Sequence, residues 1–211
     1  MDKLRLRFAK TGRAVYISHL DLMRTMQRAF FRAGLPLRYS EGFNPHAQIS
    51  IALPLSVGAA SLCELMDFRL DAEAELSEIP ARLNAVMPEG IEAIEAYQAV
   101  RKFRELKWLR VRGDFECDNK MKRELERFFS AESIVVPKRT KKGVSDMDIK
   151  PAVRSISFTD RGLEAVVSAQ EPSLNPELLV QAIEHLAPEL APDFVRFTRL
   201  EVYDEKMEIF R

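Results

Sequence analysis

The residues best suited to chemistry gather in one short segment, YSEGFNPH, at Tyr39–His46. Its aromatic and hydrogen-bonding side chains come from Tyr39, Ser40, Phe43, Asn44 and His46. Gly42 permits a turn with positive φ, and Pro45 disfavours a helical conformation at the preceding residue. A rigid turn with these groups can stack on a planar ligand and hydrogen-bond its edge, as proteins do with single-stranded RNA bases. The alternative is an ordered loop whose Phe43 fills the core beneath it.

A histidine outside this segment, His19, falls on the apolar side of a predicted helix, in its first turn. The positive end of the helix dipole disfavours a charged imidazole there, so we expect a neutral, partly buried side chain. It is either a core histidine bonded to a backbone carbonyl or a ligand-facing one that shares a surface with His46. Catalytic residues are otherwise unknown, and both histidines are candidates because imidazole transfers protons near neutral pH.

Arginines follow the opposite side of the same helix. Arg24, Arg28 and Arg32 recur at every fourth position, so they lie along one face. Guanidinium groups bind phosphate or carboxylate with paired hydrogen bonds, and we predict such contacts from Arg24 and Arg28. Since Asp21 offers Arg24 a local partner, the alternative is an ordinary solvated face.

A second basic segment follows Pro137, with its cations at Lys138, Arg139, Lys141 and Lys142. These residues are candidates for auxiliary contacts with phosphate groups, and the alternative is a solvated hairpin tip. The formal net charge of the whole chain is zero. That balance argues against a general nucleic-acid coat protein, which needs surplus positive charge, but it leaves room for a local basic patch.

The sequence lacks the residues that several common types of metal and catalytic site require. Two distant cysteines, Cys63 and Cys117, and three scattered histidines do not supply a cysteine-ligated iron–sulfur cluster or a thiolate-rich zinc site. We therefore expect no metal and no cofactor in this chain. The sequence has no nucleophile elbow, P-loop or dinucleotide fingerprint. It also has no apolar signal segment and no run of about 20 apolar residues, so we expect no membrane partner and a cytoplasmic location.

The elements that must position these groups are predicted from periodicity and caps. The first half has strands at 3–9, 48–53, 61–70 and 91–97 and helices at 18–33 and 74–86. In the first strand, leucines and a phenylalanine alternate with Arg5 and Arg7, which should face solvent. Ser18 is a good N-cap for the first helix, and Gly34 is a good residue to end it.

The second half repeats this order, with strands at 106–115, 133–138 and 195–203, a hairpin at 154–169, and helices at 118–129 and 175–186. The sequence therefore predicts the α+β class, with two tandem ferredoxin-like βαββαβ units built on antiparallel sheets. We expect domains at 1–100 and 101–211, joined near 100–105. The alternative is one mixed α+β domain.

One long stretch carries a family resemblance. The segments YISHLDLMR, RAFFRAGLPLRYSEGFNPHAQISIALPLSVG, ELMDFRL and LNAVMPEGI resemble the radical-SAM-linked protein family. That uncharacterised bacterial group occurs as a separate protein or as a C-terminal extension of a radical SAM protein. The resemblance is strong over 4–97 and looser beyond, and Ala47 stands where a second proline is expected.

The resemblance implies a radical SAM protein as partner, with the iron–sulfur cluster and S-adenosylmethionine on that partner. It also implies a link to RNA. We expect an accessory binding module without catalysis of its own, in rRNA or tRNA modification or maturation. Its binding residues would be Arg24, Arg28, Tyr39, Ser40, Gly42, Phe43, Asn44 and His46, with the basic segment in support. The alternative, by analogy with paired ferredoxin-like endonucleases that process CRISPR transcripts, is a metal-independent RNA-processing enzyme with a histidine general base.

Overall fold

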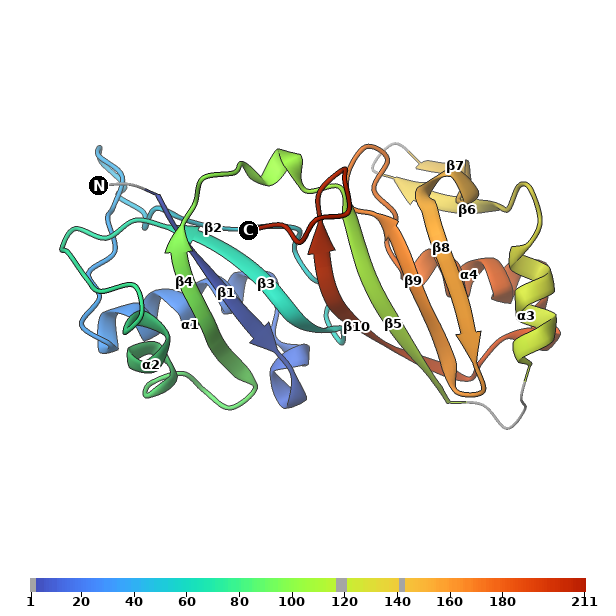
Figure 1. The fold of residues 1–211 in the computed structure, drawn as a ribbon, viewed down its shortest axis with the longest axis horizontal. Helices are drawn as coiled ribbons and strands as arrows, with labels where there is room; N and C mark the ends of the chain where they lie inside the picture. The colour runs from blue at the N-terminus through green and yellow to red at the C-terminus, as the bar shows by residue number, and fades with distance from the viewer. Residues whose placement is uncertain (1–2, 117–120, 141–142) are drawn as a thin grey trace. The chain divides into compact units, whose positions relative to one another are not determined.

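The computed structural model describes residues 3–116, 121–140 and 143–211 of the chain, with the backbone alone at 138–140. Contacts within the chain divide it into two compact units. The first runs to Glu105 and includes Arg211, and the second spans Leu106–Phe210. In both units, helices accompany strands that pair antiparallel (Figure 1), which confirms the predicted α+β class.

The first unit follows the element order strand–helix–strand–strand–helix–strand. Its elements are β1 (Leu4–Lys10), α1 (His19–Arg32), β2 (Ile49–Ile51), β3 (Ala60–Phe68), α2 (Ile79–Asn84) and β4 (Ile91–Gln98), with 3-10 helices η1 (Gly12–Tyr16) and η2 (Phe103–Glu105). In its sheet β1 lies between β4 and β3, and β2 pairs with β3. The second helix is shorter than the predicted 74–86 because it begins at Ile79, with Pro80 in its first turn.

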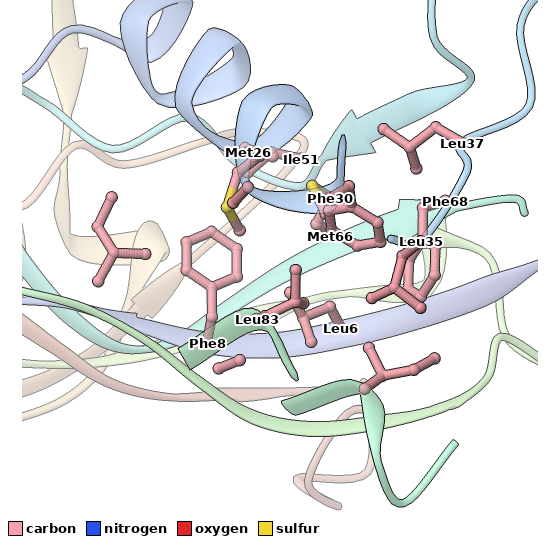
Figure 2. Packing of buried hydrophobic residues seen from close by; sticks show 14 of the residues in the cluster. Leu6, Phe8, Met26, Phe30, Leu35, Leu37, Ile51, Met66, Phe68 and Leu83 are labelled. Carbon is pink, nitrogen blue, oxygen red and sulfur yellow. The ribbon is translucent and has the colours of Figure 1, made fainter. Parts of the chain in front are cut away.

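The core of this unit lies between the sheet and α1. Side chains from β1, β3 and α1 that are at most 1% exposed include Leu6, Phe8, Met66, Phe68, Met26 and Phe30. Figure 2 shows Met26 and Phe30 pointing from the helix onto the sheet. The rings of Phe30 and Phe68 meet edge to face, with centroids 4.9 Å apart. Burying each such side chain contributes about 1.5–3 kcal/mol, so this contact fixes the helix on the sheet.

Both ends of α1 are capped as predicted. The Ser18 hydroxyl oxygen accepts a hydrogen bond from the Asp21 backbone N–H at 3.1 Å. The same hydroxyl contacts the Asp21 carboxylate at 2.7 Å, which holds the pKa of that carboxyl below its usual value. At the other end Gly34 has φ +67°, a conformation that favours glycine, and the chain leaves the helix there.

One side chain caps the edge of β4 at Ala93. The Asn84 side-chain amide donates to the Ala93 carbonyl at 2.8 Å, and its oxygen accepts from the Ala93 N–H at 2.7 Å. The amide thus makes the two bonds that another strand would make. Because open strand edges are prone to intermolecular pairing, Asn84 both stabilises β4 and protects its edge.

We expect Asn84→Ala to lower the free energy of unfolding by about 1–3 kcal/mol, since it leaves two backbone groups of Ala93 without their partner. Urea denaturation measures this change. Asn44→Ala is the control, because Asn44 is exposed in the loop of the same unit. Equal stabilities for the two variants would contradict the role assigned to Asn84.

On the face of the first sheet opposite α1, one side chain is buried that was predicted to be exposed. Arg5 was expected to face solvent, yet its side chain is fully buried. Its Nε donates to Asp67 Oδ1 at 2.7 Å, and its Nη2 donates to the Arg101 carbonyl at 2.8 Å. The guanidinium also lies over the ring of Phe103, 4.4 Å from its centroid. The segment after β4 folds back over β1 and covers this arginine, which alternation within one strand cannot predict.

In the described residues of the second unit, the helices and strands are β5 (Trp108–Glu116), α3 (Lys122–Phe129), β6 (Val135–Thr140), β7 (Gly143–Asp148), β8 (Val153–Thr159), β9 (Gly162–Ser168), α4 (Glu177–Leu186) and β10 (Phe194–Tyr203). The 3-10 helices η3 (Lys150–Ala152) and η4 (Pro188–Leu190) are short connections. Its sheet has the strand order β10-β5-β9-β8. Its buried residues include Val111, Phe129, Phe158, Leu179 and Ile183.

One predicted strand of this unit has a different partner from the one expected. β6, which corresponds to the predicted strand 133–138, pairs with β7 in a separate two-stranded sheet. The hairpin of β8 and β9 supplies the two strands that complete the main sheet.

In the described ranges of both units, none of the helices has the length and hydrophobicity of a transmembrane span.

Candidate functional site

The segment between α1 and β2 forms a closed hairpin-like loop rather than a loose connection (Figure 1). The Gln48 N–H donates to the Arg38 carbonyl at 2.8 Å, and the Ser40 N–H donates to the His46 carbonyl at 2.9 Å. Between these bonds Tyr39 and Ala47 form a β-bridge. We call residues 39–47 the recognition loop.

Side chains reinforce this closure. The Ser40 hydroxyl oxygen accepts from the His46 backbone N–H at 3.0 Å and lies 2.9 Å from Nδ1 of the same histidine. The Gln48 side-chain amide donates to the Tyr39 carbonyl at 3.3 Å. The His46 ring is therefore oriented through Nδ1, and a ligand would meet its Nε2. These bonds close the base of the recognition loop, where Tyr39 and Ser40 meet His46 and Gln48.

The aromatic side chains of the loop face solvent. Phe43 is 112% exposed relative to an extended reference, and Tyr39 is 52% exposed. The alternative in which Phe43 fills the core is therefore wrong. The small Ala47, only 6% exposed, points inward instead. At the tip Gly42 has φ +114°, which a residue with a side chain rarely adopts, and Asn44 beside it is exposed.

The two candidate histidines lie at opposite ends of α1. His19 begins the helix, near the end of the sheet where Lys10 pairs with Ser61. The recognition loop follows the helix, at the opposite end, where Leu4 pairs with Phe68. A helix of 14 residues is about 21 Å long, so the expected shared surface is wrong.

His19 is also exposed, not partly buried as expected. Its neighbour Leu20 is 58% exposed, whereas Leu22 is 3% exposed. The first turn of the helix thus lies outside the core, which begins at Leu22. The angular position of His19 on the helix was apolar, but its position along the helix axis leaves it in solvent.

The arginine row divides into three different environments. Arg24 is exposed and forms an ion pair with Asp21 at 3.3 Å. Arg28 is exposed. Arg32 donates from Nη2 to the Val86 carbonyl at 2.6 Å, just beyond α2. The row is therefore not one continuous anion site, and Arg32 serves to link two helices of the unit.

The predicted basic segment is described in part. Lys138 and Arg139 lie in β6, opposite Ser145 and Val144 of β7. The orientation of their side chains is not described, and Lys141 and Lys142 lie outside the described residues. The contribution of this segment to phosphate binding stays a prediction.

The sequence did not reveal two buried charged residues, Lys10 at the end of β1 and Glu64 in β3. Lys10 and Glu64 are each 1% exposed. The Lys10 ammonium donates to the carbonyls of Val15 and Ile17 at 3.1 and 3.3 Å. Burial lowers the pKa of Lys10, and the nearby Glu64 charge opposes that shift. Lys10 thus ties down the chain that leads into α1, and the break in alternation at the end of β1 was the available signal.

The described part of the chain offers no cluster of metal-ligating side chains. Among residues 3–116, 121–140 and 143–211, no group of three or more histidine, cysteine, aspartate or glutamate side chains could hold a metal ion. The described cysteine, Cys63, is buried. The exposed groups of the recognition loop are aromatic rings, an amide, an imidazole and the carboxylate of Glu41.

Comparison with solved structures gives remote similarity. An unknown protein from Galdieria sulphuraria is 9% identical, with a TM-score of 0.31, covering 94% of this chain and 98% of that chain. The acetolactate synthase small subunit from Thermotoga maritima is 9% identical, with a TM-score of 0.24, covering 97% and 98%. Similarity at this level carries no argument about function.

Comparison with curated proteins finds no match. A family model described as "Uncharacterized protein conserved in bacteria (DUF2344)" matches residues 3–176. These residues include every described helix and strand of the first unit, with the recognition loop, and most of the second unit. Because the match covers most of the chain, the protein belongs to this uncharacterised bacterial family, DUF2344.

Proposed function

We propose that this protein is an accessory binding module that works with a radical SAM enzyme in the modification or maturation of rRNA or tRNA. The recognition loop is its principal contact surface. The observation that carries the proposal is the full exposure of Phe43 on a loop whose ends are closed by backbone and side-chain hydrogen bonds.

The energetics favour binding at such a loop. A large aromatic side chain in solvent contributes little to folding, whereas a buried aromatic residue is a frequent hot spot of interfaces. Closure of the loop means that little conformational entropy is lost when a partner docks, so more of the contact energy appears as affinity. Phe43 and Tyr39 offer the aromatic surface, and Asn44 and His46 offer hydrogen bonds beside it.

The division of labour follows from the residues present. The resemblance to the radical-SAM-linked family supports a radical SAM partner, which would supply the iron–sulfur cluster and S-adenosylmethionine. The strand orders support ferredoxin-like units. In the first unit β4-β1-β3 is followed by β2, and in the second β10-β5-β9-β8 gives the same order if the β6–β7 hairpin is an insertion.

The alternative function is a metal-independent RNA endonuclease. The hydrogen bond between Ser40 and His46 favours it, because this bond orients the ring so that Nε2 could act as a general base. Incubation of the purified chain with labelled rRNA and tRNA in EDTA separates the two functions. We expect the RNA to stay intact, whereas cleavage that disappears in His46→Ala would establish the enzyme instead.

We expect Phe43→Ala to weaken binding of a radical SAM protein isolated with this chain from its native host about tenfold or more, since it removes an exposed aromatic anchor. The free energy of unfolding should change by no more than about 0.5 kcal/mol, because Phe43 makes no core contact. Biolayer interferometry and thermal melts measure the two effects.

Phe31→Ala is the matched control for this variant. Phe31 is a phenylalanine of the same unit, 84% exposed, but it lies in α1 and not in the recognition loop. It should bind as the unsubstituted protein does. Equal loss of affinity in both variants, or no loss in either, would show that the recognition loop is not the contact surface.

A further inference from the structure

A groove of about 550 Å³ opens in the first unit, at the end of the sheet where β1 begins and β4 ends. Aliphatic side chains line its interior: Leu4, Leu70, Ala74 and Leu76. Glu73 and Glu75, both exposed, also line it. Leu4, Ala74 and Leu76 are half-buried and pack against the core, so the groove combines anchored aliphatic side chains with two exposed carboxylates.

The groove adjoins the base of the recognition loop. Leu70, which lines the groove, forms a β-bridge with Leu37, just before the loop. The next residue, Arg38, donates from its backbone N–H to the Arg69 carbonyl at 2.8 Å and from Nε to the Asp71 carboxylate at 2.9 Å. These contacts place the groove and the base of the recognition loop next to each other on the surface of the first unit.

The charges at this surface select its partner. The Asp71 carboxylate pairs with the cation of Arg38. Glu73 and Glu75 add negative charge at the groove, and Glu41 adds more within the loop itself. Carboxylates repel phosphate groups and attract ammonium and guanidinium groups. The surface thus disfavours RNA and favours a cationic protein segment.

We propose that the groove and the recognition loop form one docking surface for an extended segment of the partner protein that carries lysine or arginine beside aliphatic side chains. Aliphatic side chains of that segment occupy the apolar floor, and its cations meet Glu73 and Glu75. Phe43, exposed in the recognition loop, contacts the adjoining part of that segment. This inference rests on the proposed role of the recognition loop, and it assigns that loop to the protein partner and not to RNA.

The test uses fluorescence anisotropy with the full chain and three labelled probes. The first is a 12-residue peptide of alternating lysine and leucine, the second has glutamate in place of lysine, and the third is a 12-nucleotide single-stranded RNA. We expect the lysine peptide to bind, with affinity that falls as salt rises. The glutamate peptide should not bind. Tighter binding of RNA than of the lysine peptide to this surface, or no binding of the lysine peptide, would overturn the proposal.

Charge reversal locates the site. Glu73→Lys with Glu75→Lys should weaken binding of the lysine peptide tenfold or more. Glu89→Lys with Glu92→Lys makes the same change of charge at exposed positions outside the groove, and it should change affinity less than twofold. Equal effects of the two double variants would mean that binding depends on the net charge of the chain, and the proposed site would then be wrong.

Phe43→Ala separates this inference from the function on which it rests. If it weakens binding of the radical SAM protein while the reversal at Glu73 and Glu75 does not, the groove is wrong and the recognition loop stands. If the reversal weakens that binding while Phe43→Ala does not, the groove stands and the assigned role of the loop is wrong. Circular dichroism melts confirm that each variant is folded.

Discussion

Phe30→Ala should lower the free energy of unfolding of the first unit by about 3–5 kcal/mol, the usual cost of removing a buried aromatic ring. Phe30 is fully buried, and its ring packs edge to face on Phe68 (Figure 2). The substitution removes both the apolar surface and this contact between helix and sheet. Since a chain of two compact units can unfold in two steps, urea denaturation should follow the transition of the first unit.

The control is one residue away. Phe31→Ala removes the same group from the same helix, but Phe31 is 84% exposed, so the free energy of unfolding should change by no more than about 0.5 kcal/mol. The contrast tests whether α1 is rotated as described. A larger loss for Phe31→Ala than for Phe30→Ala would place the wrong face of the helix on the sheet.

Asp67→Ala should destabilise the first unit by a similar amount, about 3–5 kcal/mol, because removing one partner of a buried ion pair is strongly destabilising. Asp67 is 5% exposed and accepts from the fully buried Arg5. In the variant Arg5 keeps the Arg101 carbonyl and the Phe103 ring, but neither carries a formal negative charge. Denaturation curves measure the loss.

A surface ion pair of the same unit gives the comparison. Asp71 pairs with Arg38 at 2.9 Å, and their side chains are 54% and 34% exposed. Such pairs contribute about 0–1 kcal/mol, so Asp71→Ala should have a small effect on stability. If Asp67→Ala were no more destabilising than Asp71→Ala, the burial assigned to Arg5 would be wrong.

The elements with strong periodicity and local caps were predictable from the sequence. α1 begins and ends within one residue of the predicted 18–33, because Ser18 and Gly34 act through contacts with near neighbours. The apolar face of the helix was predictable for the same reason, since Leu22, Met26 and Phe30 follow the helical repeat.

Features that depend on distant segments were not predictable. The burial of Arg5 requires the chain near Phe103 to fold over β1, and alternation along a strand contains no such information. His19 falls on the apolar side of α1, but it lies in the first turn of the helix, which extends past the core into solvent. The strand β7, with a glycine, a serine and two aspartates in six residues, has weak strand propensity and is formed through pairing with β6.

In the recognition loop, one feature was predictable from the sequence and another was not. Gly42 and Pro45 predict a turn, and the turn is present. Whether Phe43 points into the core or into solvent depends on the bridge between Tyr39 and Ala47, which turns the small alanine inward. The composition of the segment admits either arrangement, and only the pairing of the two sides of the loop decides between them.

Site-specific photo-crosslinking in the native host tests the central claim most directly. Benzoylphenylalanine is placed at position 43 in one variant and at position 31 in another, both exposed positions of the first unit. Mass spectrometry then identifies the crosslinked molecules. We predict that a radical SAM protein is crosslinked from position 43 and not from position 31. Equal crosslinking from both positions, or crosslinks from position 43 that contain no radical SAM protein, would contradict the proposed function.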